Sequence, residues 1–139
     1  MKNLLFAGLF LSLNAFASGN KTIEPGLYNA VDVDSGTITA QLVIRADGTL
    51  NFKVQTPDFE MPDPGCDGVY TVVGESFKSD LKCPIAILPE VSVNIDVTNV
   101  NPQSIRSATG AVVPVVIDAL GADATIFRLK IVEAAAAKK

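Results

Sequence analysis

Apolar and polar residues alternate along most of this chain, and this pattern restricts the fold more than any other feature. Eight segments rich in β-branched residues carry the alternation, and they span residues 27–34, 37–45, 49–56, 68–73, 76–83, 91–98, 111–119 and 124–133. Because successive side chains of a β-strand point to opposite faces, each segment is predicted to be a strand with one apolar face. We find no convincing helical pattern after residue 17, so an all-β protein is predicted.

Short turns join these segments, which favours consecutive antiparallel hairpins. A three-residue loop at residues 46–48 and a two-residue turn at residues 35–36 each place apolar side chains opposite one another. The opposed pairs predicted in these two hairpins are Ile44 with Leu50, Leu42 with Phe52, Val31 with Ala40, and Leu27 with Ile44.

The two cysteines lie at positions that one hairpin would bring together. If Gly74-Glu75 is a two-residue turn, Cys66 and Cys83 are directly opposed, at a Cα separation of ~4.5–5.5 Å that suits a disulfide. An even cysteine count in an exported chain also indicates a disulfide. The same register puts one apolar row on a single face, made of Tyr70, Val72, Phe77 and Leu81.

About eight sequential strands with one apolar face are expected to close on themselves, because an open sheet would leave bare edges and a wet apolar face. An antiparallel up-and-down barrel is therefore predicted. A β-sandwich or open barrel is the alternative, because Pro89, Pro102 and Pro114 interrupt the later strands. The stretch 99–110 is long enough for a further short strand around Ile105.

The chain begins with features of a cleavable signal peptide: Lys2, an apolar run over residues 4–13, and small residues before a cleavage site after Ala17. Residues 1–17 are predicted to be removed, residues 18–133 to form one β-barrel domain with a mobile lead at 19–24, and residues 134–139 to form a flexible tail. The predicted location is the periplasm or the extracellular space. The apolar run is shorter than the ~20 residues of a membrane-spanning helix, so no membrane span is predicted.

An outer-membrane barrel would show the same alternation. Most of the strands are shorter than the ~9–11 residues that a spanning strand needs. The seven Phe and two Tyr are few for aromatic girdles, and the chain ends in Lys138-Lys139. These features favour a barrel that does not span a membrane.

The order of elements resembles the small secreted barrels of the calycin or lipocalin-like group. Pro25-Gly26-Leu27-Tyr28 opens the first strand, the hairpins are short and one disulfide is expected. Gly26-Leu27-Tyr28 stands where lipocalins have Gly-x-Trp. This resemblance implies a small apolar molecule held inside the barrel, and it assigns no individual binding residue.

Composition argues against several classes of function. The chain has no His, which is the commonest general base and metal ligand, and no nucleophile-and-base spacing is found, so no catalytic residue, cofactor or enzyme activity is predicted. A net charge of −4 with scattered Lys and Arg argues against nucleic acid as a partner. The acidic residues fit no standard ion loop, so no metal site is predicted, and Asp32 and Asp34 are interpreted as a surface pair.

The most distinctive segment is the acidic, proline-rich stretch 57–67, which is longer than an ordinary hairpin loop. Its candidate binding residues are Phe59, Met61, Asp58 and Glu60, which would act as a lid over the barrel mouth or as a protein-binding edge. In the alternative interpretation, Phe59 and Met61 fill the end of the barrel as core residues. The predicted function is binding of a small apolar ligand, and the alternative is a protein-interaction or inhibitor module acting through this segment.

Overall fold

The computed structural model describes residues 21–56, 58–85 and 89–135. The predicted signal peptide and residues 136–139 of the predicted tail lie outside the described residues. The strands are β1 (Gly26–Asp32), β2 (Ile38–Ile44), β3 (Thr49–Thr56), β4 (Phe59–Glu60), β5 (Cys66–Val73), β6 (Ser76–Lys82), β7 (Glu90–Asp96), β8 (Ala111–Ile117) and β9 (Thr125–Ala134). Two short 3₁₀ helices are η1 (Ser104–Arg106) and η2 (Asp118–Leu120). Among the described residues, no helix combines the length and apolar character needed to cross a membrane.

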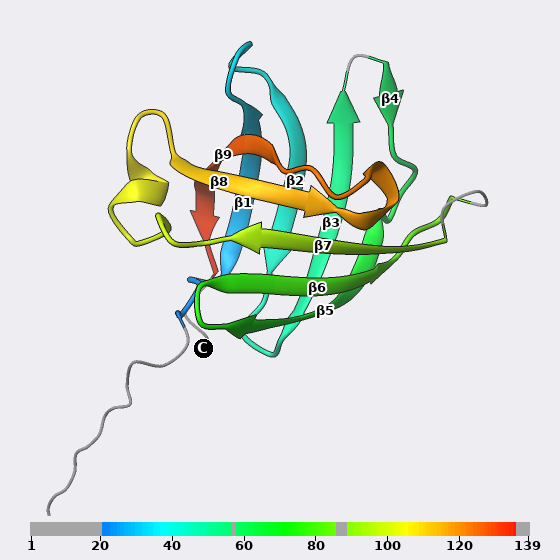
Figure 1. Ribbon diagram of the computed structural model, residues 1–139, viewed down its shortest axis with the longest axis horizontal. Helices are drawn as coiled ribbons and strands as arrows, with labels where there is room; N and C mark the ends of the chain where they lie inside the picture. Colours follow the sequence, from blue (N-terminus) through cyan, green and yellow to red (C-terminus); the bar gives the residue numbers. More distant parts are fainter. Residues whose placement is uncertain (1–20, 57, 86–88, 136–139) are drawn as a thin grey trace, which may run out of the picture.

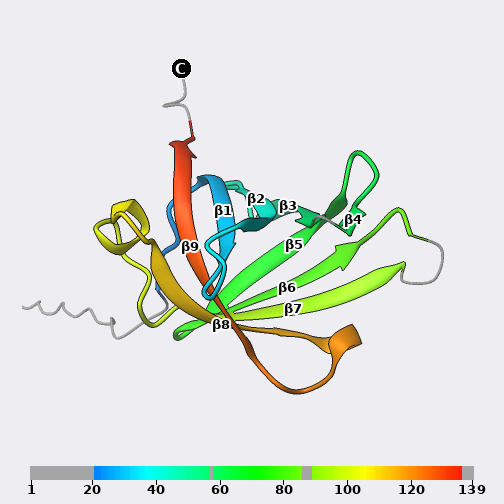
Figure 2. The same cartoon turned by 90° about the horizontal axis from the view of Figure 1, so that it is seen from above.

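Eight of these strands form a closed antiparallel barrel. Each pairs with its neighbours along the chain, β1 pairs with β9 to complete the circle, and β4 lies outside, paired only with the end of β3. Strands β5 to β8 cross in front of β1 to β3 in Figure 1, and Figure 2 shows the sheet curling round from above. The predicted up-and-down barrel is confirmed, and each of the eight predicted segments overlaps one of its strands.

The mouth of the barrel is the end at which β1, β3, β6 and β8 end, and the base is the opposite end.

Two segments differ from their predicted form. The stretch 99–110, near the base, contains η1 with Ile105 buried, and not a further strand. The stretch 57–67 contains β4, which was not predicted because prolines surround it.

Two of the three predicted registers are confirmed. Ile44 pairs with Leu50 across β2 and β3, and Val72 pairs with Phe77 across β5 and β6, as the turns at 46–48 and 74–75 require. Gly48 has a φ of 90°, a left-handed conformation that Gly adopts at little cost. Local turn geometry was therefore sufficient to align both hairpins.

The predicted register of β1 and β2 is wrong by one residue. Ala30 pairs with Ala40, and Tyr28 with Leu42, where the two-residue turn would have placed Val31 opposite Ala40. The pairing is irregular between Ala30 and Val31, where Val31 pairs with Ile38, and the loop beyond it contains a hydrogen bond from Asp34 N to Asp32 Oδ1 (2.7 Å). A one-residue shift exchanges the two faces of a strand, so Tyr28 and Ala30 point inward in place of the residues beside them.

The base of the barrel is filled and covered. Tyr28, which is fully buried, donates a hydrogen bond from Oη to Glu24 O (2.5 Å). Glu24 in turn accepts two hydrogen bonds from the guanidinium of Arg106 on η1, at 2.9 and 2.6 Å. The described part of the lead, predicted to be mobile, is thus attached to the base, with Ile23 buried. The buried side chains that cover this end are Ile23, Val97, Val100 and Ile105.

Candidate functional site

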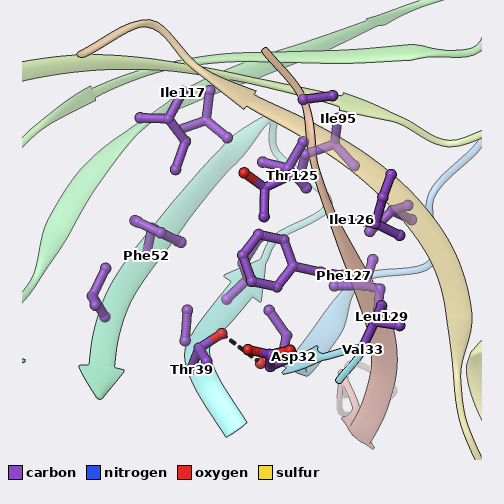
Figure 3. A pocket seen from close by; sticks show the side chains of 18 of the residues that line it. Asp32, Val33, Thr39, Phe52, Ile95, Ile117, Thr125, Ile126, Phe127 and Leu129 are labelled. Carbon is purple, nitrogen blue, oxygen red and sulfur yellow. Dashed lines mark hydrogen bonds between the residues drawn. The ribbon is translucent and has the colours of Figure 1, made fainter. Parts of the chain in front are cut away.

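The mouth half of the barrel encloses a cavity of about 820 Å³. Side chains from β1, β2, β3, β7, β8 and β9 line it, and the described residues of β5 and β6 do not. The walls are mainly aliphatic and aromatic, and Figure 3 shows Phe52, Phe127, Ile95 and Leu129 around the same space. A volume in the range of ~300–1,000 Å³ with largely apolar walls is typical of small-molecule sites.

The cavity exists because two inward positions of the barrel wall carry alanine, where larger side chains would fill the space. Ala30 and Ala40 face each other across β1 and β2, and both line the cavity. One step toward the base on each strand, Tyr28 and Leu42 form the next inward pair, and Tyr28 is fully buried without bordering the cavity. The change from alanine to large side chains therefore marks the floor of the hollow part.

A second group of large side chains fills the barrel on the β5 and β6 side. The rings of Tyr70 and Phe77 are stacked with centroids 4.7 Å apart. Ser79, buried between neighbouring strands, donates a hydrogen bond from Oγ to Val93 O (2.9 Å), so its polar group is satisfied. This packing holds the wall opposite the β1–β2 hairpin without occupying the cavity.

Apolar side chains continue from the cavity onto the surface at the mouth. Val33, Leu120 and Ile126 all line the cavity, yet they are 39%, 78% and 43% exposed. Single exposed apolar residues are ordinary, but these three belong to one opening. The cavity therefore opens to solvent between the β1–β2 loop and the segment that holds η2.

The polar groups of the cavity gather beside this opening. Asp32, Asp34, Thr39, Thr56 and Thr125 line it. Figure 3 places Asp32 and Thr39 on the same side of the cavity. The Thr39 hydroxyl donates a hydrogen bond to Ala30 O (3.1 Å), which leaves an oxygen lone pair at the wall.

The sequence predicts Asp32 and Asp34 to be a surface pair. Asp34 is indeed exposed, but the structure places both aspartates at the cavity. Sequence reasoning missed them because it assigned β1 the wrong register. It also missed the mouth residue Leu120, whose only signal is a large apolar side chain beside the turn at Gly121.

The four candidate residues of the stretch 57–67 divide into two groups. Met61 is only 5% exposed, and its Sδ contacts Cys66 Sγ at 3.4 Å. Phe59 is 44% exposed on β4, and Asp58 and Glu60 beside it are exposed as well. None of these four side chains borders the cavity. Met61 is therefore a core residue, and Phe59 belongs to the outer surface.

The predicted disulfide is present between Cys66 and Cys83, with an S–S distance of 2.04 Å. It joins the start of β5 to the residue after β6 at the mouth end. Met61 packs on one of its sulfurs, so the disulfide also supports the segment that returns from β4.

Several groups at the base of the barrel have displaced pKa values. Burial raises the pKa of the Tyr28 phenol. Hydrogen bonds from Arg106 lower the pKa of Glu24, and hydrogen bonds from Thr49 lower the pKa of Asp47. These shifts follow from contacts that hold the base together. Within the part of the chain that the structure describes, no three acidic or cysteine side chains are grouped as metal ligands.

The fold and cavity define a closed eight-stranded antiparallel barrel that is hollow toward one end. Comparison with protein-family models, with curated proteins and with solved structures finds no match to this chain.

Proposed function

We propose that this protein is an exported binding protein that holds a small apolar ligand in the mouth half of its barrel. The single observation that supports this most strongly is the cavity of about 820 Å³, which has apolar walls and an open mouth. Eight-stranded barrels have an interior wide enough to hold one small ligand, as lipocalin-like barrels do. A hollow of this size would normally be filled by side chains if stability alone determined the sequence.

Export fits this proposal. The sequence begins with a predicted signal peptide, and disulfides persist mainly in oxidising compartments outside the cytosol. We propose binding in preference to catalysis because the chain has no His and its cysteines are both in the disulfide. A carrier or a ligand-sensing protein needs only a shaped apolar interior and an open entrance.

A titration with N-phenyl-1-naphthylamine, an uncharged dye whose emission rises in apolar surroundings, tests the proposal. Val54→Phe enlarges a half-buried side chain of the cavity wall, and Val73→Phe adds the same ring to an outward position that is 56% exposed. We expect saturable binding of one dye per chain, weakened about tenfold or more by Val54→Phe and unchanged by Val73→Phe. Absence of saturable binding, or equal loss in both folded variants, would contradict the proposal.

A second candidate function is protein interaction through β4. The observation that favours it is Phe59, a large apolar side chain exposed between two exposed acidic residues on a strand outside the barrel. Crosslinking in the native compartment would test it with Phe59→Ser, and Val73→Ser is the matched control. Loss of a specific crosslinked partner in Phe59→Ser alone, at an unchanged melting temperature, would support this function. The same crosslinks in both variants would contradict it.

A further inference from the structure

Only two charged residues line the cavity among the described residues, and both are acidic. Asp32 ends β1 and Asp34 follows it in the β1–β2 loop. The other polar side chains that line the cavity are threonines. A ligand that fills the apolar interior would therefore meet negative charge where it emerges at the mouth.

These carboxylates have oxygens available to a ligand. Asp32 Oδ1 accepts hydrogen bonds from Asp34 N and Ser35 N, at 2.7 and 3.4 Å, and these bonds fix the side chain at the rim. The second oxygen of Asp32 accepts no hydrogen bond from residues 21–56, 58–85 or 89–135, and the Asp34 carboxylate accepts none from those residues either. Two carboxylates held at one rim are suited to a cationic group that donates hydrogen bonds.

The charge of the connecting segments has the same sign. The described segments at the mouth end, residues 33–37, 58–65, 83–85, 89 and 118–124, contain six acidic residues and no Lys or Arg. Lys53 on β3 pairs with one of the six, Asp63. The corresponding segments at the base, residues 21–25, 45–48, 74–75 and 97–110, contain three acidic and three basic residues. The acidic residues at the mouth end are Asp34, Asp58, Glu60, Asp63, Asp118 and Asp123.

We propose that the cavity selects an amphiphile with an uncharged apolar body and a cationic head, of the alkylamine type, whose head lies at Asp32 and Asp34. The inference rests on the proposed function, since it specifies the ligand of the same cavity. A charged head avoids the low-dielectric interior and stays at the opening, where carboxylates attract an ammonium group and repel a carboxylate. The acidic mouth also raises the local concentration of cations relative to anions.

A matched series tests the charge preference. Decylamine, decanol and decanoate carry the same chain with a positive, a neutral and a negative head, and each is used below its aggregation concentration to displace bound N-phenyl-1-naphthylamine. We expect decylamine to compete best and decanoate least, with the difference shrinking as salt is added. Equal competition by all three would overturn the proposed head-group selectivity and leave the proposed apolar cavity intact. Failure of the dye itself to bind would instead contradict the proposed function.

Variants then assign the preference to the two rim residues. Asp32→Asn keeps the Oδ1 acceptor of the loop, and Asp34→Asn removes a charge that makes no hydrogen bond within the described residues. We expect the double variant to lose about fivefold in decylamine affinity, with decanol affinity unchanged. Asp123→Asn, which removes an acidic residue of the same end that does not line the cavity, is expected to keep the preference. A decylamine preference that survives in the double variant would overturn the assignment, and Asp34→Asn alone provides the test if the double variant does not fold.

Discussion

Cys66 and Cys83 lie directly opposite each other at the mouth end of β5 and β6, with their Cα atoms 4.1 Å apart. The disulfide therefore closes a hairpin whose other end is the turn at Gly74-Glu75. Through Met61, which contacts Cys66, the same disulfide supports the segment between β4 and β5. One covalent link thus holds two neighbouring parts of the barrel rim.

Replacement of both cysteines by alanine is expected to lower the free energy of unfolding by about 3 kcal/mol. The two cysteines are 17 residues apart. In the chain-entropy model, the unfolded chain gains conformational entropy when a loop of this length is no longer closed, and this gain corresponds to about 3 kcal/mol of free energy. Urea unfolding of wild-type protein with and without a reductant provides the control. A double variant as stable as the oxidised wild-type protein would contradict the expectation.

Met61 and Phe59 are expected to respond differently to the same substitution. Met61→Ala empties a buried position and should cost about 2–5 kcal/mol of unfolding free energy. Phe59→Ala removes a side chain that is 44% exposed and should change stability by less than about 1 kcal/mol. Chemical denaturation of both variants measures the difference. Equal losses would show that Phe59 is also part of the core.

Gly68 on β5 is expected to tolerate no side chain. A Cβ at this position would lie 1.9 Å from Asp80 O on β6, because the two strands approach closely there. We expect Gly68→Ala to lower the unfolding free energy by several kcal/mol, on the order of 3 or more. Gly36→Ala is the matched control, because a Cβ at Gly36 would meet no atom within 4 Å. Only the positive φ of Gly36 disfavours an alanine there, and we expect the unfolding free energy to fall by about 1 kcal/mol. A smaller loss of unfolding free energy in Gly68→Ala than in Gly36→Ala would contradict the close approach of β5 and β6 at this position.

Alkaline pH is expected to weaken the fold through Tyr28. Burial raises the pKa of this phenol in the folded state, while an unfolded tyrosine titrates near a pKa of about 10. The contribution of Tyr28 to stability is thus fully present below about pH 10. It is lost progressively as the pH rises above that value, because the unfolded chain then releases a proton that the folded chain retains.

Two single-tyrosine variants separate this effect from that of Tyr70, whose pKa burial also raises. In Tyr70→Phe, we expect the remaining phenolate absorbance to appear only as the protein unfolds. In Tyr28→Phe, we expect the stability to fall less steeply above about pH 10. Titration of Tyr28 at its ordinary value in the folded protein would contradict its burial.

The barrel was largely predictable because most of its register is set by local chemistry. Gly48 and the turn at 74–75 align their hairpins, and the alternation then identifies the buried face. The β1–β2 hairpin was not predictable in the same way. Both faces of residues 27–31 carry apolar side chains, so the pattern could not choose between them, and the alternation gives no signal for the irregular pairing between Ala30 and Val31.

The sequence predicted the apolar character of the candidate site but not its position or its volume. A resemblance to ligand-binding barrels predicted an apolar interior, but whether that interior is hollow depends on pairings between distant residues. Ala30 facing Ala40 leaves space, and Tyr28 below them closes it. Leu120 borders the cavity because the barrel places η2, which contacts β7, at the same end as the β1–β2 loop, and no local pattern records that placement.

The most direct test of the hollow barrel is a crystal structure with 1-bromooctane bound, in which anomalous scattering locates the bromine. We expect one bromine peak inside the barrel, among the side chains of Phe52, Val115 and Phe127. A peak found only on the outer surface, or a barrel whose interior is filled by its own side chains, would contradict the proposal that the mouth half is a ligand site.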